Sequence, residues 1–293
     1  MPQRAEIPLV LVGYGDIAAR VARNHPHHPI YALARQLPLR PAAHADSWYG
    51  RAFDLDADLP SDLPVGAVWV YLAPPASHGT VDVRVERWLS AIVPTELPAQ
   101  VIYASTTGVY GDHQGGWVTE ETPATPAHDR GRRRLDAESR FQTWCAQRSI
   151  PCTVLRVTGI YACDRLPLDR IRAGDPVVCL EESPWSNRIH ADDLADIVGC
   201  LIERLRQGAP VQGVFNVSDN HPRPMTDLYL ETARHFGLPA PPSRPLLEIL
   251  ANSRPMAREF LSESKRIDAQ AIQRALNWQP KYPDLLHGLA DCG

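Results

Sequence analysis

Residues 9–18 read LVLVGYGDIA, in which a continuous apolar run enters Gly13, Tyr14 and Gly15 and a helical pattern containing Ala18 follows. The spacing is G-x-G-x-x-A. Gly13 permits a tight turn, Gly15 leaves room for a pyrophosphate to approach the backbone, and the small Ala18 lets the helix pack close to the strand. The N-terminus of such a helix offers free N–H groups and the positive end of its dipole to an anion. The stretch therefore predicts a dinucleotide-binding strand–turn–helix, with an ordinary glycine turn as the alternative.

Apolar runs of strand length alternate with helical patterns along most of the chain. Most of these runs are continuous rather than alternating, which is typical of strands buried on both faces of a parallel sheet. The expected strands are 7–12, 30–34, 48–53, 65–72, 101–104, 153–157 and 214–217, and the expected helices are 16–24, 78–92, 130–148 and 192–206. Repeated strand–helix–strand units predict an α/β fold, a doubly wound parallel (Rossmann) sheet of about seven strands.

The pattern changes after residue 218 to helices and proline-rich loops without a strong strand. We expect a dinucleotide-binding Rossmann domain over residues 1–218, with a cap excursion near 163–184, and a small helical C-terminal cap or substrate region over 219–293. The ligand pocket of such a fold lies at the carboxyl ends of the strands, where the strand order reverses.

Composition excludes several classes of protein. The chain has 293 residues, 44% of them hydrophobic, and its 30 basic and 34 acidic side chains give a net charge of −4. This balance offers no electrostatic case for nucleic acid or an anionic membrane as partner. The longest apolar run, 65–73, falls far short of the ~20 residues that span a bilayer. Because the first apolar run leads directly into the glycine motif, it predicts a core strand rather than a signal peptide, and we expect a cytoplasmic protein.

The cysteines show no spacing typical of a zinc ribbon or a redox motif. We expect all of them to be small buried hydrophobic residues, reduced in the cytosol, and we expect no metal site. They are Cys145, Cys152, Cys163, Cys179, Cys200 and Cys292.

Arg35 indicates which dinucleotide the fold would bind. It follows the second expected strand, 20 residues after Gly15, where NAD-binding folds place a carboxylate that holds the ribose 2′-hydroxyl. A guanidinium there can instead grip a 2′-phosphate with two hydrogen bonds, so we expect NADP, with NAD as the alternative. The alternative is that Arg35 is a solvated loop residue. Asp54, after the third strand, either meets the adenine amino group or caps a helix.

Further segments resemble the extended short-chain dehydrogenase/reductase family, which includes nucleotide-sugar epimerases and dehydratases. These segments are VIYASTTGVYG (101–111), VLRVTGIY (154–161), RIHADDLA (188–195), VFNVSD (214–219) and ALNWQP (275–280). Their order and spacing cover nearly the whole chain. The LAPP segment at 72–75, where the family commonly has Leu-Ala-Ala, indicates an atypical member. The chain as a whole resembles the bacterial YeeZ-like proteins.

The resemblance implies a specific catalytic arrangement. The family uses a Ser or Thr together with Tyr-x-x-x-Lys on the following helix, where the lysine lowers the pKa of a tyrosine that acts as acid or base. Thr106 matches the hydroxyl position. In the helix segment RGRRRLDAE, alignment on Glu138 places Arg130 at the tyrosine position and Arg134 at the lysine position. An arginine keeps its proton near neutral pH and cannot replace the tyrosine.

Four other side chains are candidates for the missing acid, namely Tyr110, Tyr161, His128 and His190. A packing role for the tyrosines and a surface or capping role for the histidines are simpler alternatives. Arg188 and Arg266 could grip a substrate phosphate from the cap, although surface ion pairs would explain them too.

These observations predict an NADP-dependent oxidoreductase or epimerase/dehydratase-like enzyme that acts on a small polar substrate, with a nucleotide-linked substrate as one option. The alternative is a catalytically silent NAD(P)-binding sensor or regulatory protein. The predicted catalytic residues are Thr106, Tyr110 and Arg134. The predicted cofactor-binding residues are Gly13, Tyr14, Gly15, Asp16, Ile17, Arg35, Asp54, Ala73, Pro74, Ser105 and Arg134.

We also expect a homodimer. The helices at 78–92 and 130–148 pair across the two-fold axis in the extended family. Here they carry Trp88, Leu89, Phe141 and Trp144, which need to be covered.

Overall fold

The computed structural model describes residues 6–37, 39–41 and 47–293, and its long strands form one seven-stranded sheet. The strand order is β12-β7-β5-β4-β1-β2-β3, and every neighbouring pair is parallel. The bounds are β1 Leu9–Val12, β2 Ile30–Ala34, β3 Trp48–Ala52, β4 Val68–Tyr71, β5 Gln100–Thr106, β7 Cys152–Val157 and β12 Gly213–Val217. The predicted α/β doubly wound sheet is confirmed.

The inner strands follow the continuous apolar runs of the sequence. β1, β4 and β7 are buried at every position, because helices cover both faces of the sheet. β4 begins later than the expected residue 65, because Gly66 has a φ of +69° and turns the chain before the strand. In the edge strand β3, by contrast, no residue is fully buried.

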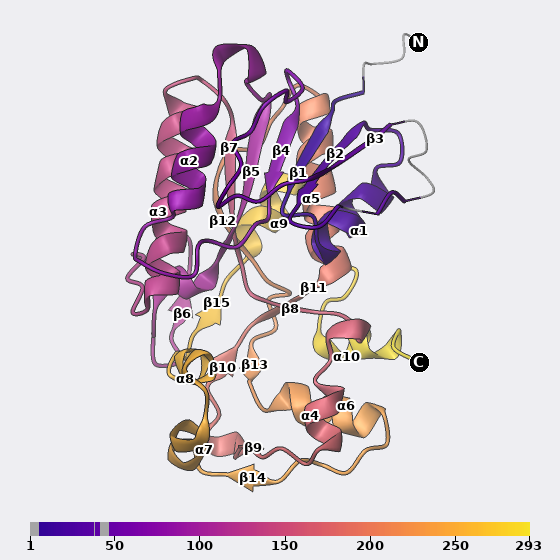
Figure 1. Ribbon diagram of the computed structural model, residues 1–293. Helices are drawn as coiled ribbons and strands as arrows, with labels where there is room; N and C mark the ends of the chain where they lie inside the picture. Colours follow the sequence, from indigo (N-terminus) through magenta and orange to yellow (C-terminus); the bar gives the residue numbers. More distant parts are fainter. Residues whose placement is uncertain (1–5, 38, 42–46) are drawn as a thin grey trace.

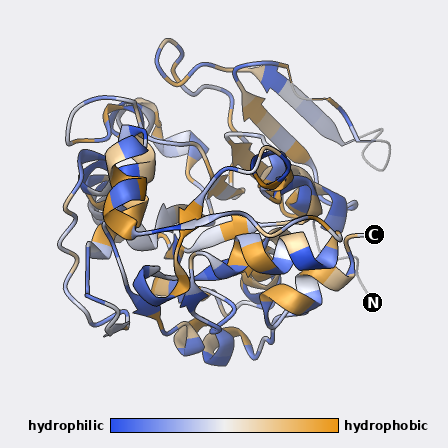
Figure 2. Cartoon of the chain, turned by 90° about the horizontal axis from the view of Figure 1, so that it is seen from below, coloured by the Kyte–Doolittle hydropathy of each residue, from blue (hydrophilic) through white to orange (hydrophobic). Residues whose placement is uncertain are grey.

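Two layers of helices cover the sheet (Figure 1). Helix α1 (Asp16–Asn24) packs against α5 (Ala191–Arg206) on one face, and α2 (Val83–Ala91) packs beside α3 (Asp129–Ala146) on the other. Figure 2 shows that the helices of the molecule carry both hydrophobic and hydrophilic residues. One core cluster lies under each layer.

The large apolar side chains of α2 and α3 belong to the core of this chain. Trp88 and Phe141 are at most 1% exposed, and Leu89 and Trp144 are 7% exposed. Trp144 stacks on Trp69 of β4, with ring centroids 5.7 Å apart. The sheet therefore already covers the groups that were expected to need a dimer partner, and the homodimer stays a prediction without this support.

The cap lies at the carboxyl ends of the strands and is built from short pieces (Figure 1). Four two-stranded pairs occur there, β8 (Gly159–Tyr161) with β11 (Arg188–His190), β10 (Trp185–Ser186) with β13 (Arg223–Pro224), β9 (Val177–Val178) with β14 (Ser243–Arg244), and β6 (Trp117–Val118) with β15 (Arg266–Ile267). The cap helices are α4 (Leu168–Arg172), α6 (Asp227–His235), α7 (Leu246–Asn252), α8 (Pro255–Leu261) and α10 (Leu285–Ala290). The strands after residue 218 were not predicted, because two-residue strands leave no periodic pattern in a sequence.

Part of the expected cap region packs with the Rossmann layer. Helix α9 (Gln270–Leu276) contacts β12 and α5, and Ile272 and Trp278 lie in the same core cluster as α1. The indole Nε1 of Trp278 donates to the Asp196 carboxylate at 2.6 Å. Residues 219–293 therefore leave the sheet and return to it, rather than forming a cap along their whole length.

The cysteine prediction is wrong for one pair. Cys163 and Cys292 form a disulfide that ties the first residue of the short 3-10 helix η4 (Cys163–Arg165) to the C-terminal end of the chain. Cys163 is exposed rather than buried. Cys145 and Cys152 are buried free thiols as expected, and Cys179 and Cys200 are half-buried. A sequence separation of 129 residues gives no local signal of such a pairing.

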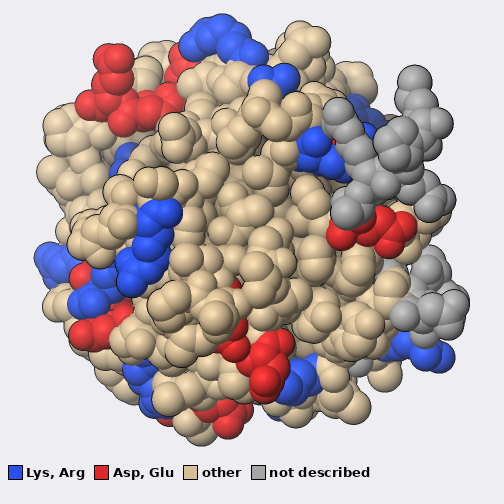
Figure 3. All heavy atoms as spheres, turned by 90° about the horizontal axis from the view of Figure 1, so that it is seen from above, with Lys and Arg blue, Asp and Glu red and all other residues tan. Residues whose placement is uncertain are grey.

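On the face opposite the cap, basic and acidic side chains both lie around the edge (Figure 3). Within the described part of this face, no large area of a single charge is visible. Among the described residues, no helix is long and apolar enough to cross a membrane, and no group of three or more His, Cys, Asp or Glu side chains is placed to hold a metal ion.

Candidate functional site

A cleft of about 1100 Å³ opens where the strand order reverses between β1 and β4. Four segments line it together with Arg84, namely the glycine turn at 12–16, the described residues of 33–41, residues 53–55 and residues 73–74. The glycine motif and the chain after β2 therefore meet in one cavity, as the sequence predicted. The volume is large enough for an extended ligand.

Gly13 and Gly15 have different reasons to be glycine. Gly13 has a φ of +84°, and a Cβ there would lie 2.6 Å from the Cα and backbone nitrogen of Ala73. A Cβ at Gly15 would meet its nearest atom, the Gly13 carbonyl oxygen, only at 4.0 Å, because the position faces the cleft. Gly13 thus lets two strand ends come together, and Gly15 leaves free space for a ligand beside the backbone.

Helix α1 points its N-terminus into this cleft without a side-chain cap. Its first residue, Asp16, pairs with two arginines, with Arg20 Nε at 2.9 Å and Arg165 Nε at 3.1 Å. The two guanidinium groups offset a carboxylate that would otherwise oppose an anion at this helix end. Ile17 is 9% exposed and belongs to the core, so its side chain is not available to a cofactor.

Tyr14 lines the cleft, and its ring meets Trp48 edge-on with centroids 5.2 Å apart. Ala73 and Pro74 form the neighbouring wall at the end of β4. Asp54 also lines the cleft, but one of its oxygens accepts the backbone N–H of Asp56 at 3.0 Å. This carboxylate therefore closes a local turn.

Arg35 lies in the cleft directly after β2, and Arg40 and Arg84 line the same cavity. Arg84 is held in place by Asp56, whose carboxylate accepts two hydrogen bonds from it, at 2.7 and 2.5 Å. This pairing lowers the pKa of Asp56. Of these three arginines only Arg35 is predictable from the sequence, because the chain gives no local signal that a loop residue and a residue of α2 reach the same cavity.

At the end of β5 the two predicted hydroxyl residues have different surroundings. The Thr106 hydroxyl accepts the backbone N–H of Gly108 at 3.2 Å and begins the 3-10 helix η3 (Thr107–Tyr110). Ser105 is buried and donates to Glu138, which also pairs with Arg156 inside the molecule. The Ser105 side chain is therefore committed to α3 and β7, which corrects its predicted role at the cofactor.

The predicted catalytic role of Tyr110 also needs correction. The residue is fully buried, its hydroxyl donates to Asn216 at 2.8 Å, and the Arg156 guanidinium lies 4.7 Å from its ring centroid. Burial raises the pKa of this phenol. A buried hydroxyl with an internal partner cannot reach a substrate, so Tyr110 is a packing residue, the simpler alternative considered for it.

Arg130 and Arg134 start α3 beside the ends of β4 and β5. The Nη1 atom of Arg134 donates to the carbonyls of Ala104 and Ala73, at 2.9 and 3.3 Å, and to the Tyr103 hydroxyl at 3.2 Å. Burial raises the pKa of Tyr103 to about 12, and the charge of Arg134 opposes that rise. The Arg130 guanidinium lies 5.4 Å from the centroid of the Phe260 ring, which belongs to cap helix α8.

The other proposed acids have structural partners. The Tyr161 hydroxyl donates to the Asp284 carbonyl at 3.0 Å. His190 lies between the rings of Tyr161 and Tyr282, and burial lowers its pKa. His128 precedes α3 and lies 3.9 Å from the Glu263 carboxylate.

The two cap arginines, Arg266 and Arg188, have different surroundings. Arg266 donates to the Gly115 carbonyl at 2.6 Å and lies over the rings of Trp117 and Trp185, so it is a packing residue. Arg188 is 6% exposed and lines a second cavity of about 320 Å³, inside the cap. Arg165 lines this cavity too, so its ion pair with Asp16 joins the cap cavity to the cofactor cleft.

Sheet order, glycine turn and cleft together define a Rossmann-type dinucleotide-binding protein with a cap over the carboxyl ends of its strands. Residues 82–218 match the model of the NAD dependent epimerase/dehydratase family. The chain belongs to the NAD-dependent epimerase/dehydratase family, the extended short-chain dehydrogenases/reductases.

Three relatives illustrate the range of the similarity. Protein YeeZ of Escherichia coli K12 is 27% identical over 237 residues, which cover 80% of this chain and 76% of that protein. A functionally unknown conserved protein from Silicibacter pomeroyi DSS has a structure with a TM-score of 0.78, 30% identity and 97% coverage of both chains. MoeE5, solved in complex with UDP-glucose and NAD, has a TM-score of 0.74 at 20% identity, with 98% and 96% of the two chains covered, and shares the fold.

Proposed function

We propose that this chain is an NADP(H)-dependent oxidoreductase that holds a small polar substrate between the cofactor cleft and the cap. The observation that carries the proposal is Arg35, which lines the cleft directly after β2 together with Arg40 and Arg84. A 2′-phosphate would find bidentate donors there, whereas a carboxylate at this position would repel it.

The residues at the glycine turn fit a dinucleotide. The Gly15 position is open to the cleft, and the N–H groups at the start of α1 have no side-chain cap. We infer that the backbone of 13–17 holds the pyrophosphate and that Arg35 holds the adenosine end. A bound nicotinamide dinucleotide supplies hydride transfer, while the protein supplies orientation and electrostatics. MoeE5, which shares the fold, was solved with NAD.

On the substrate side, Thr106 is the hydroxyl best placed by sequence to polarise a substrate oxygen, and Arg130 and Arg134 supply fixed positive charge beside it. A guanidinium can donate hydrogen bonds to a developing oxyanion. It cannot accept a proton as a tyrosinate does. The proposed chemistry is therefore reduction of a carbonyl, in which the bound dinucleotide would supply the hydride and water the proton, or the reverse oxidation of an alcohol, in which the hydroxyl proton would pass to water, rather than epimerisation through a tyrosinate base.

Calorimetric titration with NADPH and with NADH tests the cofactor assignment. We expect wild type to prefer NADPH. Arg35→Asp should lose roughly 1.5–3 kcal/mol of NADPH binding, the contribution of a charge-assisted hydrogen bond, and should bind NADH about as before. Arg234→Asp, an exposed change on α6 in the cap, is the matched control and should alter neither affinity. Equal affinities in wild type, or an unchanged preference in Arg35→Asp, would refute the assignment.

A catalytically silent NADP-binding sensor is the second candidate, and the two arginines at the dyad positions favour it. The two candidates differ in turnover. An oxidoreductase changes the absorbance at 340 nm when substrate is added, whereas a sensor binds the cofactor and turns nothing over. Combining Arg130→Tyr with Arg134→Lys restores the family's pair. If the epimerase activity of this double variant on UDP-glucose exceeds that of wild type by ~10²-fold or more, the loss of the pair explains why wild type is catalytically silent.

A further inference from the structure

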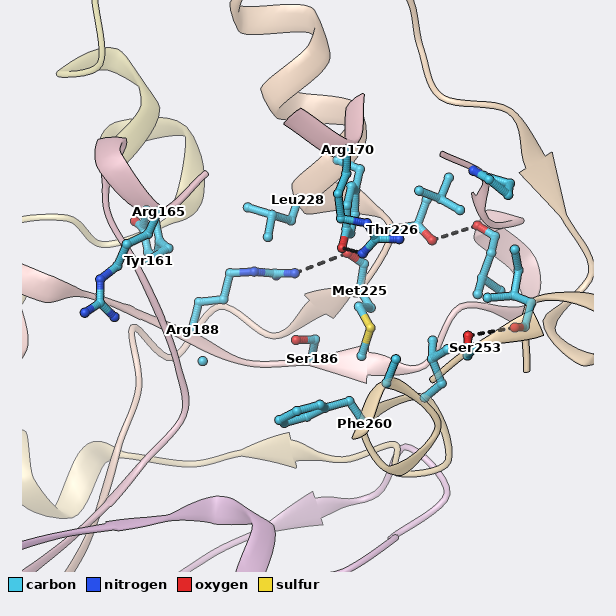
Figure 4. Close-up of a pocket in the computed structure, with 18 of the residues that line it drawn as sticks. Tyr161, Arg165, Arg170, Ser186, Arg188, Met225, Thr226, Leu228, Ser253 and Phe260 are labelled. Carbon is cyan, nitrogen blue, oxygen red and sulfur yellow. Dashed lines mark hydrogen bonds between the residues drawn. The ribbon is translucent and has the colours of Figure 1, made fainter. Parts of the chain in front are cut away.

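The cap holds a second cavity, which is separate from the cofactor cleft (Figure 4). Its volume of about 320 Å³ is at the lower end of the range for small-molecule sites, ~300–1,000 Å³. Most of its wall is apolar and includes Val177, Val178, Met225, Leu228, Ile249 and Phe260. A ligand of this cavity must therefore be compact and must have an apolar body.

One buried charge faces this apolar space. Arg188 comes from β11, is 6% exposed and extends across the cavity, with Leu228 and Phe260 on either side of it in Figure 4. Its Nη2 atom donates to the Met225 carbonyl at 3.2 Å. Among the described residues, no ion pair within 4.0 Å joins Arg188 to a carboxylate, and the opposite charges that influence it most are those of Asp219 and Asp227. Burial lowers the pKa of this guanidinium, which reflects the cost of keeping its charge away from water.

The other two arginines of the cavity are already paired. Arg165 reaches Asp16, and Arg170 reaches the Asp175 carboxylate at 3.1 Å and the Tyr229 hydroxyl at 2.6 Å. The cavity therefore has one cation without a close carboxylate partner. A single guanidinium fits one planar carboxylate through two parallel hydrogen bonds, whereas a diphosphate brings more charge than this cavity offsets.

The cavity also meets the catalytic side of the fold. Phe260 forms part of its wall, and the same ring lies under Arg130, at the position of the family's catalytic tyrosine. A ligand held by Arg188 would therefore lie in a cavity whose wall residues Phe260 and Arg165 contact Arg130 and Asp16.

We propose that the cap cavity binds a compact monocarboxylate, held by Arg188, whose branched or cyclic apolar body carries the carbonyl or alcohol group that reacts, and that this class, rather than a nucleotide sugar, is the substrate class of the site. The proposal rests on the proposed function in taking the cap as the substrate side. The carboxylate would give Arg188 a counter-charge in direct contact, and the apolar body would replace water along the wall.

Titration of the full-length chain with matched probes, in the presence and absence of NADPH, tests this proposal. The probes are 4-methylpentanoate, its neutral amide 4-methylpentanamide, 3-methylbutyl phosphate and UDP-glucose. We expect the carboxylate to bind with a Kd on the order of 0.1–1 mM, as a ligand of this size allows. The amide should bind about 10-fold or more weakly, because it lacks the charge. The phosphate ester and UDP-glucose should be weaker than the carboxylate.

Variants locate the binding. Arg188→Gln should weaken carboxylate binding about 10-fold or more and leave the amide unchanged, and Arg188→Lys should lose less because it keeps the charge. Arg172→Gln, an exposed arginine of α4 outside the cavity, should change nothing. If Arg188→Gln fails to fold, Arg188→Lys and the comparison of acid with amide on wild type decide the question.

Equal binding of acid and amide would overturn the proposal. It would also be overturned if UDP-glucose or the phosphate ester bound more tightly than the carboxylate, or if Arg188→Lys had no effect on the carboxylate. NADPH affinity is read from the same samples. A chain that binds NADPH but not the carboxylate refutes this inference alone, whereas a chain that binds the carboxylate but not NADPH refutes the proposed cofactor alone.

Discussion

The guanidinium of Arg165 lies 3.1 Å from the carboxylate of Asp16, and this ion pair connects the cap to the first turn of the helix that follows the glycine motif. Asp16 lines the cofactor cleft and Arg165 lines the cap cavity. Arg20 pairs with the same carboxylate from within α1. We expect the N-terminus of this helix to hold a pyrophosphate, and Asp16 places a negative charge there. Arg165 of the cap neutralises part of that charge.

Arg165→Ala is therefore expected to weaken NADPH binding, because Asp16 then keeps only Arg20 as a partner. The pair is partly exposed, so we expect an effect of about 0.5–1 kcal/mol, or roughly a 2- to 5-fold rise in Kd. In an Asp16→Asn background the same substitution should have no effect. Calorimetric titration of the four proteins completes the cycle, and an equal loss in both backgrounds would show that Arg165 does not act through Asp16.

The Cys163–Cys292 disulfide makes a prediction about stability. It joins residues 129 apart in sequence, so reduction should enlarge the conformational freedom of the unfolded chain and lower the free energy of unfolding by roughly 2–4 kcal/mol. Thermal unfolding with and without reductant measures the change. A variant with Cys163→Ser and Cys292→Ser should be insensitive to reductant. Thiol titration of the denatured, unreduced protein should find four thiols, and six would contradict the pairing.

The sequence predicted the sheet well, because each of its central strands is a continuous apolar run bounded by turns. The run before Gly13 gave β1 to within two residues, and the helices at 16–24 and 192–206 were found almost in full. The cap was predicted as a region and not in detail, since its strands are two residues long and pair across large sequence distances. The return of α9 to the sheet likewise depends on tertiary packing that no local pattern encodes.

The candidate site shows the same division. Motif spacing predicted that Gly13, Gly15 and Arg35 follow strand ends, and all three line one cleft, while their role in cofactor binding stays a prediction. Ser105 and Tyr110 could not be assigned correctly, because adjacent residues of one strand or turn point to opposite sides, and only the structure shows that these two face Glu138 and Asn216. The roles of Arg84 and Arg165 depend on long-range contacts and left no signal in the sequence.

Asp219 predicts a pH dependence of stability. Burial raises its pKa from an ordinary 3.8 to about 7, so the folded state holds this proton more tightly than the unfolded state does. As pH rises from 3.8 to about 7, Asp219 ionises in the unfolded state but stays protonated in the folded state. The free energy of unfolding therefore falls over this range. At pH 8 the free energy of unfolding is lower by about 4 kcal/mol than at a pH where Asp219 is protonated in both states.

Asp219→Asn should remove this dependence, because the amide stays neutral and its oxygen can still accept the backbone N–H of His221. We expect the variant to become more stable than wild type as pH rises, with the gap in unfolding free energy widening by about 2–3 kcal/mol from pH 5 to pH 8. Urea unfolding at several pH values measures this gap. A gap that stays constant with pH would show that Asp219 titrates normally.

The two glycines of the motif separate packing from ligand binding. Gly13→Ala forces a Cβ to within 2.6 Å of the Ala73 backbone at a φ of +84°, so we expect the unfolding free energy to fall by about 2–5 kcal/mol without any ligand. Gly15→Ala meets no protein atom closer than 4.0 Å and has an ordinary φ of −129°, so the unliganded protein should keep its stability to within about 0.5 kcal/mol. The added methyl group points into the cleft, however, and should weaken NADPH binding about 10-fold or more by blocking the approach of the pyrophosphate to the backbone. Urea unfolding without cofactor, followed by NADPH titration of the same samples, gives both quantities. If Gly15→Ala bound NADPH as wild type does, the pyrophosphate could not lie against this turn, and the cleft would hold its ligand in some other way.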